Sequence, residues 1–484
     1  MNNPADAQLK KAIDLHKAGR AHEAETLYRA FLGAQPRHGE ANHNLGALLA
    51  QRGEMVQSLP FFRTALEADS SVGQYWLSYA RALHSAGRSD EAQTLLQRGR
   101  RQGLSGPACD ALTAKTFVAM GKFDDAAEAF QNAAALQPEN ADLFFSLGNT
   151  RAVQGKFHDA IAAYRRAIAI KPDFAEAFFR LGSILSENGH IAEGFAHYMR
   201  RAALVYGGGK PPLPAKPEPE HKLKHDREQR QYLAGGKAYR DASGMANQFH
   251  LEPGERVTGP AVNPANATPA LLDQWRTSHP QLVVIDDFLS AEALNNLRRY
   301  CAGSTIWRRI YDAGYIGATP EDGFACPLLA QIVEEIPRTF ANILGPHHFH
   351  YLGAFKYDSA LSTGTNTHAD NSAVNVNFYI APDEANLDPQ SGGMDIWDVT
   401  VPSGQDMRLY NGDEALTRDF LRRSNARLTR IAHRANRAVI FRSDLFHKTS
   451  DCHFQEGYLN KRINVSLLFG HRGALATERP VRTE

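Results

Sequence analysis

Small and large residues recur with a fixed spacing along the first two hundred residues of the chain. Glycine returns every 34 residues, at Gly19, Gly53, Gly87, Gly121, Gly155 and Gly189. Nine residues after each glycine stands a large apolar residue: Tyr28, Phe62, Leu96, Phe130, Tyr164 and Tyr198. Between them, five residues after each glycine, stands a small residue that would let two helices approach. The pattern is typical of helical hairpins with glycine in the turn, and it predicts six of them over about residues 5–202.

Each unit adds two further features. A Leu-Gly pair stands in the first helix at Leu147-Gly148 and at Leu181-Gly182, and Pro36, Pro138 and Pro172 end their units. With these features the region resembles the tetratricopeptide repeat (TPR) family. The resemblance implies a curved solenoid whose concave face binds a peptide or protein segment, and use of the repeats only for dimerisation or for bracing the other domain stays open. Four polar residues fall on the expected inner face, and a face that is only solvated would explain them equally well: His43, Arg81, Asn149 and Ser183.

The period stops after Leu204. Residues 207–231 are rich in glycine, proline and charge, and the sequence up to 268 carries little pattern. Such composition is typical of an exposed connector. The predicted organisation is therefore an all-α domain at 1–204, a connector at 205–268, a second domain at 269–472 and a tail at 473–484.

Short β-like runs dominate the second domain. PQLVVIDDFLS predicts a strand that leads to a helix capped by Ser290, and CPLLAQIVEEIPRTFANIL predicts a helix with Pro337 inside it. Five further strands are predicted in FHYLGAFKY, AVNVNFYIA, GGMDIWDV, RAVIF and RINVSLLFG. Short strands at irregular spacing favour a β-sandwich or barrel such as a jelly roll, with the helices outside. We therefore expect a multidomain α + β protein.

Candidate metal ligands stand beside these strands. His368 and Asp370 are two residues apart in TNTHADNS, so in an extended segment both side chains point to the same side. His447 follows the apolar run RAVIF. Two histidines and one carboxylate on one face form the facial triad of non-haem Fe(II) oxygenases. Arg462 opens the strand RINVSLLFG, where its guanidinium suits a carboxylate held through two hydrogen bonds.

The motifs THAD, NFYIAP, SGGMDIWD, NRAVIFRSDLFHKT and KRINVSLLFG make about residues 280–472 similar to the 2-oxoglutarate/Fe(II)-dependent oxygenases, in their prolyl-hydroxylase-like branch. The resemblance implies a double-stranded β-helix in which the triad holds the catalytic iron. It also implies that Arg462, Tyr357 and Tyr379 bind 2-oxoglutarate. The implied cofactor is Fe(II), and the implied cosubstrates are 2-oxoglutarate and O2, with ascorbate as a candidate auxiliary reductant.

Other residues compete for these roles. The competitors are Arg442, Lys448 and Lys461 for the carboxylate, and His433 and His453 for the third metal ligand. The histidines of HHFH (His347, His348 and His350) lack a cysteine or acidic partner at the spacing of a zinc site, which favours a loop at a strand edge. Residues 400–436 form an insertion with an expected helix over 414–424, and it would lie over the mouth of the site.

Composition changes this picture little. The chain carries 54 Lys and Arg against 53 Asp and Glu, so nothing favours a nucleic acid as partner. No apolar run of about 18 residues predicts a membrane span. Four scattered cysteines, without a CxxC pair, favour a reducing, cytoplasmic location.

The predicted function is that of an enzyme, an Fe(II)- and 2-oxoglutarate-dependent dioxygenase. Its expected substrate is a protein or peptide that the TPR region recruits for side-chain hydroxylation. Two alternatives stay open. The enzyme would instead hydroxylate a small molecule and use the repeats for assembly, or the chain would be a non-catalytic TPR scaffold with a vestigial oxygenase fold.

Overall fold

The computed structural model describes residues 4–208, 217–235, 249–345, 347–361, 365–402 and 405–472. The chain divides into two compact units, Met1–Pro172 and Asp173–Glu484. This division falls one helical hairpin before residue 204, where the sequence period ends. The predicted tail at 473–484 lies outside the described residues, as do 209–216 and 236–248 of the predicted connector.

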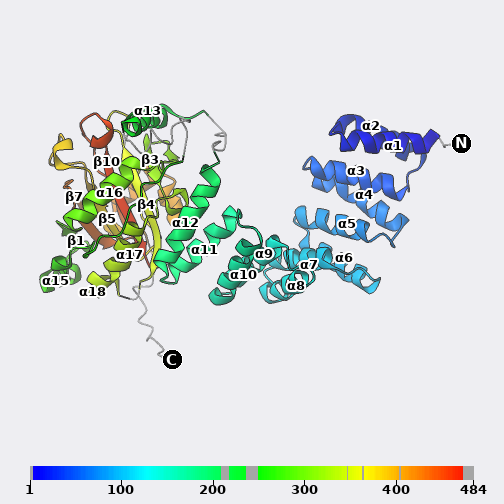
Figure 1. The fold of residues 1–484 in the computed structure, drawn as a ribbon, viewed down its shortest axis with the longest axis horizontal. Helices are drawn as coiled ribbons and strands as arrows, with labels where there is room; N and C mark the ends of the chain where they lie inside the picture. The colour runs from blue at the N-terminus through cyan, green and yellow to red at the C-terminus, as the bar shows by residue number, and fades with distance from the viewer. Residues whose placement is uncertain are drawn as a thin grey trace, which may run out of the picture. The chain divides into compact units, whose positions relative to one another are not determined.

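The described part of the first unit consists of paired helices, each pair lying beside the next along the chain (Figure 1). The pairs are α1 (Pro4–Lys17) with α2 (Ala21–Ala34), α3 (Gly39–Gln51) with α4 (Met55–Ala68), α5 (Gly73–Ser85) with α6 (Ser89–Arg101), α7 (Pro107–Ala119) with α8 (Phe123–Leu136), and α9 (Ala141–Val153) with α10 (Phe157–Ile170). The predicted hairpins are therefore confirmed here.

The repeated residues explain why these hairpins form. All six repeated glycines have φ between 72° and 86°, the left-handed region that a side chain rarely adopts. Gly148 of α9 lies directly against Tyr164 of α10, and a Cβ atom on Gly148 would stand 2.6 Å from the Tyr164 ring. The Leu-Gly pair and the large residue of the next helix thus mark one close contact between paired helices.

The second unit begins with the sixth hairpin, α11 (Ala175–Glu187) and α12 (Ile191–Tyr206). Ile191, Phe195 and Tyr198 of α12 belong to the main hydrophobic core of this unit. The other described helices of the unit are α13 (Glu220–Ala234), η1 (Pro264–Asn266), α15 (Pro269–Thr277), α16 (Ala291–Gly303), η2 (Pro320–Asp322), α17 (Pro327–Thr339), α18 (Ala341–Leu344), η3 (Asp383–Ala385), α19 (Met407–Asn411), α20 (Glu414–Arg423) and η4 (Tyr458–Asn460).

Two antiparallel sheets form the centre of the second unit. The seven-stranded sheet has the order β1 (Leu282–Ile285), β8 (Ala438–Arg442), β5 (Val374–Tyr379), β10 (Arg462–Phe469), β4 (Phe349–Tyr357), β3 (Tyr315–Ala318) and β2 (Arg309–Tyr311). The three-stranded sheet has the order β7 (Leu428–Ile431), β6 (Met394–Thr400) and β9 (Leu445–Thr449). All six strands predicted from the sequence are present, and Ser290 caps α16 as predicted.

The two faces of the large sheet have different characters. In β10, Val465 and Leu467 join the main core, which also contains buried side chains of α16 and α17. These helices cover one face of the sheet in Figure 1. Asn464 and Ser466, which alternate with them, line a cavity on the other face. The sheet is therefore apolar towards the helices and polar towards the cavity.

The range predicted as a connector contains packed structure. In α13 the buried residues recur every three or four positions, at Lys222, His225, Gln229 and Leu233, so one side of this helix packs on the second unit. Further on, Val257, Ala261 and Val262 join the main core. In the part of the chain that the structure describes, no helix is long and apolar enough to cross a membrane.

Candidate metal centre

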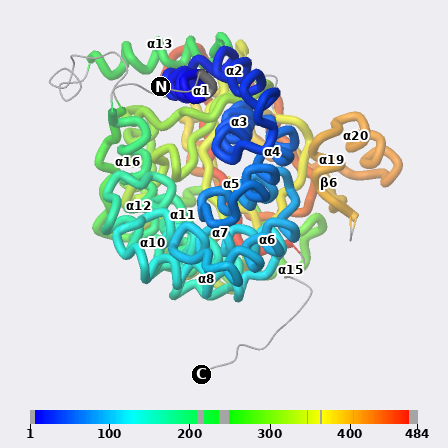
Figure 2. Tube along the Cα trace, turned by 90° about the vertical axis from the view of Figure 1, so that its right-hand side faces the viewer, coloured from blue at the N-terminus to red at the C-terminus, as the bar shows by residue number. Residues whose placement is uncertain are grey.

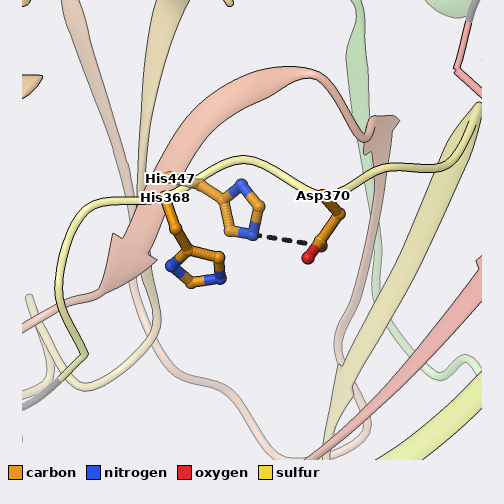
Figure 3. A group of neighbouring side chains, drawn as sticks. All are labelled: His368, Asp370 and His447. Atoms are coloured by element: carbon orange, nitrogen blue, oxygen red, sulfur yellow. Dashed lines mark ion pairs between the residues drawn. The ribbon is translucent and has the colours of Figure 1, made fainter. Parts of the chain in front are cut away.

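The predicted triad comes together beside the middle of β9, where His447 lies. His368 and His447 exchange two backbone hydrogen bonds, of 3.0 and 2.8 Å, as a short antiparallel bridge. The backbone N–H of Asp370 donates to the carbonyl of Ser443 at 2.8 Å, which holds Asp370 beside the turn that leads into β9. The side chains of His368, Asp370 and His447 therefore project into one region (Figure 3).

The three side chains lie at ligand distances from one another. Each offers a nitrogen or oxygen atom, and these atoms all lie within 4.8 Å of one another. The Nε2 atom of His447 is 3.4 Å from Oδ2 of Asp370, and the two imidazole ring centres are 4.4 Å apart. Within the described residues, no other group of three His, Cys, Asp or Glu side chains could hold a metal ion. Of the HHFH histidines, His347 and His348 directly precede β4, and His350 lies within it.

Hydrogen bonds orient the three candidate ligands. Nδ1 of His368 lies 2.8 Å from the carbonyl of Asn366, and Nδ1 of His447 lies 2.9 Å from the carbonyl of Leu445. Because a carbonyl only accepts, each Nδ1 carries a proton, which leaves Nε2 as the nitrogen that would face a metal. The amide of Asn375 donates to Oδ2 of Asp370 at 2.7 Å. Such partners fix the tautomer and direction of metal ligands.

The pKa shifts of His368 and Asp370 favour the forms of these two residues that bind a cation. Burial lowers the pKa of His368, and the neighbouring His447 lowers it further. Burial alone would raise the pKa of Asp370, but the hydrogen bond and charge of His447 hold that pKa below its ordinary value. A neutral imidazole and an ionised carboxylate are the forms that bind a divalent metal.

The triad opens on a cavity of about 250 Å³. Residues from both sheets line it, so it lies between them. The lining includes Tyr351, Phe355 and Tyr357 of β4, Asn375 and Asn377 of β5, Asn464 and Ser466 of β10, and Met394 of β6. The carboxamide oxygen of Asn377 is buried without a hydrogen-bond partner. A polar cavity of this kind suits a small polar ligand beside the triad.

Arg462 is fully buried at the beginning of β10. Its guanidinium donates to the carbonyl oxygens of Gly392 and Gly393, at 2.5 and 3.0 Å, and to Oδ1 of Asn464 at 2.7 Å. Among the described residues, no carboxylate lies within 4.0 Å of it. Three of its five N–H groups therefore meet neutral acceptors, and its charge has no anionic partner.

The two predicted tyrosines flank this arginine. Its Cζ atom lies 4.8 Å from the ring centre of Tyr357 and 5.2 Å from that of Tyr379. Tyr357 also lines the cavity, and its hydroxyl accepts a hydrogen bond from Thr449. The hydroxyl of Tyr379 is buried without a hydrogen-bond partner. Burial raises the pKa of both tyrosines to about 12, although Arg462 opposes the shift.

The competing residues lie in other settings. Arg442 pairs with Asp444 at 2.7 Å, and Lys461 pairs with Asp358 at 2.6 Å, so each already has an anionic partner. His433 packs between the rings of Tyr379 and Phe454, not beside the triad. Lys448 follows His447 in β9, where successive side chains point to opposite faces, so Lys448 points away from the triad. His453 is exposed.

Two residues that hold the segment 367–370, called the ligand loop below, were not predicted. Asn411, at the end of α19, exchanges two hydrogen bonds with the backbone of Ala369, at 3.0 and 2.8 Å. Glu414, at the beginning of α20, accepts from the backbone N–H of Thr367 at 2.8 Å. Both belong to the insertion, whose helices (Figure 2) share a hydrophobic cluster with Trp397 and Val399 of β6. The predicted helix over 414–424 is confirmed as α20, but the sequence offered no signal for contacts more than forty residues away.

Inner-face candidates of the repeats are mostly engaged with neighbours. His43 bonds to Ser78 at 2.9 Å, Asn149 accepts from the hydroxyl of Tyr164 at 2.8 Å, and Ser183 donates to Glu187 at 3.1 Å. Arg81 is exposed.

Comparison with known proteins identifies the N-terminal region. Residues 9–73, 112–173 and 146–204 match the tetratricopeptide repeat family. The N-terminal helices are tetratricopeptide repeats. No curated protein matches the chain, and the C-terminal β domain, an antiparallel sheet domain with helices, is of unidentified family.

Several solved structures are similar to the repeat region. YrrB, described as a TPR protein with an unusual peptide-binding site, is 18% identical, with a TM-score of 0.32 over 37% of this chain and 91% of its own. The type IV pilus biogenesis factor PilW is 14% identical, with a TM-score of 0.39 over 42% of this chain and 94% of its own. MamA from Desulfovibrio magneticus RS-1 is 15% identical, with a TM-score of 0.34 over 36% of this chain and 98% of its own.

Proposed function

We propose that the chain is an Fe(II)- and 2-oxoglutarate-dependent dioxygenase that hydroxylates a side chain of a protein or peptide recruited by its TPR region. One observation carries the proposal. The ligand atoms of His368, Asp370 and His447 converge at a polar cavity, and a buried arginine without an anionic partner contacts two residues that line the same cavity. A metal and an anionic cosubstrate would together satisfy both features.

The three candidate ligands fit iron in their chemistry. Two imidazoles present Nε2, and one carboxylate completes a face, which leaves the remaining coordination positions open. When bound, Fe(II) would supply the activation of O2 that is coupled to decarboxylation of 2-oxoglutarate. The chain would hold the ligands in their tautomers and limit the access of water. The packing of the two antiparallel sheets supports a jelly-roll interpretation, because their facing sides line one cavity.

The setting of Arg462 fits one carboxylate of 2-oxoglutarate. The guanidinium keeps two N–H groups beyond the three in hydrogen bonds, and burial makes an anionic partner favourable. The hydroxyl of Tyr379 is buried without a partner and can donate a hydrogen bond to such a carboxylate. We propose that the tyrosine hydroxyl joins Arg462 in binding the carboxylate, and that the cavity holds the body of the cosubstrate.

The repeats would act by raising the local concentration of substrate. A peptide held on a domain of the same chain reaches the metal site in an intramolecular step, which strengthens a weak encounter without new contacts at the iron. Protein binding is also the common use of stacked helical hairpins.

Succinate production tests the proposal. The full chain, loaded anaerobically with Fe(II), would receive 2-oxoglutarate, O2, ascorbate and a library of peptides. We expect iron-dependent succinate that is abolished in His368→Ala and retained in His348→Ala, since His348 is an exposed histidine outside the triad. In Arg462→Lys the apparent affinity for 2-oxoglutarate should fall while iron binding stays.

Each rival predicts another result. Succinate that no peptide stimulates, but that a small molecule does, would favour the small-molecule hydroxylase. Absence of both iron binding and 2-oxoglutarate binding in the folded chain would overturn the enzyme and leave a TPR scaffold.

A further inference from the structure

A second cavity of about 250 Å³ lies on the helix-covered side of the large sheet. Lys356 of β4 lines it, whereas the next residue, Tyr357, lines the metal cavity on the opposite face. Its remaining walls are largely apolar or aromatic. They are formed by Tyr232 of α13, Ala302 of α16, Ile380, Ala381 and Pro382 after β5, Tyr458 and Leu459 of η4, and Ile463 of β10.

The charged residues around this cavity all carry the same sign. They are Lys356, Arg298, Arg299 and Lys461, and the lining contains no aspartate or glutamate. Lys461 is already paired with Asp358. Within the part of the chain that the structure describes, the other three form no ion pair: Arg298 donates to the carbonyl of Ile380, and Arg299 donates to the amide oxygen of Asn296.

Lys356 is the decisive residue. It is 3% exposed, and its ammonium lies 3.6 Å from the ring centre of Tyr458 and 5.4 Å from that of Trp307. No oxygen of the described residues accepts a hydrogen bond from it. Burial lowers its pKa to about 7, although the charges of Glu228 and Asp226 oppose the shift, and neither carboxylate forms an ion pair with it. A buried ammonium against aromatic rings, without an acceptor, is costly unless an anion completes its surroundings.

The aromatic wall beside Lys356 is held in place. The hydroxyl of Tyr458 donates to the carbonyl of Ala302 at 2.8 Å and accepts from Gln229 of α13 at 2.9 Å. Tyr232 packs against the same ring, with ring centres 5.2 Å apart. A ligand would therefore find this surface already formed, which reduces the entropy lost on binding.

We propose that this cavity binds a small amphipathic carboxylate, with its anionic head on Lys356 and its apolar body against Tyr458 and Leu459. Arg298 and Arg299 would add a positive rim. The mainly apolar walls favour a carboxylate with a hydrocarbon or aromatic body over inorganic phosphate. The inference does not depend on iron or on the proposed oxygenase activity.

Calorimetry with the full, metal-free chain tests this site, with phenylbutyrate as the probe and its uncharged amide as the comparison. We expect the carboxylate to bind at least about tenfold more tightly than the amide, because a hydrogen bond to a charged partner is worth about tenfold or more. Lys356→Met should weaken phenylbutyrate binding about 10- to 100-fold. Arg299→Gln, at the exposed rim, should weaken it about two- to fivefold.

Arg408→Gln is the matched control, because Arg408 is exposed on α19 outside this cavity. It should bind phenylbutyrate as the unaltered chain does. Equal affinity for acid and amide, or no binding at millimolar concentration, would overturn the proposal. Circular dichroism establishes the fold of each variant. If Lys356→Met does not fold, the test passes to Arg299→Gln, which changes an exposed side chain, and unchanged phenylbutyrate affinity in that variant would overturn the proposal.

Discussion

The first five hairpins and the sixth share one sequence pattern but bury it against different neighbours. In the first unit the buried residues form small separate clusters, each limited to adjacent helices, such as the one around Tyr28 and Phe31. In α12 the equivalent face contributes Phe195 and Tyr198 to the main core of the β domain. The repeat pattern thus specifies a helical hairpin, and the neighbouring surface decides which unit the hairpin stabilises.

Truncation should produce the largest effect. A chain of residues 173–484 keeps α11 and α12, whereas one of residues 205–484 loses the buried Ile191, Phe195 and Tyr198. Loss of three large core side chains costs roughly 6 kcal/mol or more, which is comparable to the whole stability of a domain. We expect the longer fragment to unfold cooperatively in urea and the shorter one to be largely unfolded. Equal stability of the two fragments would show that the sixth hairpin belongs to the repeats alone.

The next largest effect is expected at acidic pH, where His433 should lower the stability of the second unit. Burial and the nearby Arg462 lower its pKa to about 4, and both its ring nitrogens lack hydrogen-bond partners. Because the pKa of an unfolded histidine is about 6.5, the unfolded chain takes up the proton first, and stability falls as pH decreases from about 6.5 to 4. The loss should reach about 3 kcal/mol at pH 4.

His433→Phe keeps a ring against Tyr379 and Phe454 but cannot be protonated. Urea denaturation between pH 7.5 and 4 should therefore show a shallower loss of stability in this variant. The same slope in both proteins would mean that His433 is not held neutral by its surroundings.

The same contrast explains what the sequence could predict. In the repeats, Gly148 meets Tyr164 sixteen residues later, so a local period records the contact. In the β domain the candidate ligands His368 and Asp370 were recognisable because alternation in an extended segment places their side chains on one side of the chain. His368 and His447 lie beside each other because of a β-bridge between segments that are distant in the sequence. Only the resemblance to a known family predicted that these two segments meet.

Contacts made by solitary side chains escaped prediction. The side chain of Asn411 forms hydrogen bonds with both backbone groups of Ala369. The sequence around Asn411 looks like that of an ordinary helix end and does not reveal these contacts. Lys356 stands in the run FHYLGAFKY, which predicts a strand correctly but does not reveal that its lysine is buried against Tyr458. Such residues depend on surfaces that the tertiary fold creates.

Asn411→Ala should loosen the metal centre without removing a ligand. The change deletes both hydrogen bonds to Ala369, the residue between His368 and Asp370. Loss of a group that orients metal ligands typically costs about 10- to 100-fold in metal affinity. Titration with Fe(II) or Mn(II) under anaerobic conditions measures the effect, with Arg408→Ala on the same helix as the control. Unchanged affinity would show that the ligand loop holds its shape without the insertion.

The smallest expected effect comes from alanine at two equivalent glycines, Gly148 in the first unit and Gly182 in the second. At Gly148 the new Cβ would meet the ring of Tyr164, a side chain that can shift, whereas at Gly182 it would stand 2.9 Å from the backbone oxygen of Gly194. Overpacking costs about 1–3 kcal/mol, and the gain in helix propensity offsets about 1 kcal/mol of it.

Gly148→Ala should therefore destabilise its hairpin by about 1 kcal/mol, and Gly182→Ala by at least about 1 kcal/mol more, because backbone yields less than a side chain. Hydrogen exchange read by mass spectrometry resolves the two hairpins. If the units are separate, faster exchange in Gly148→Ala should stay within α9 and α10. In Gly182→Ala it should spread from α11 and α12 into the β domain. Faster exchange that spreads into the β domain in both variants would contradict the separation into two units. The two hairpins, which share a sequence pattern, would then also share their stability.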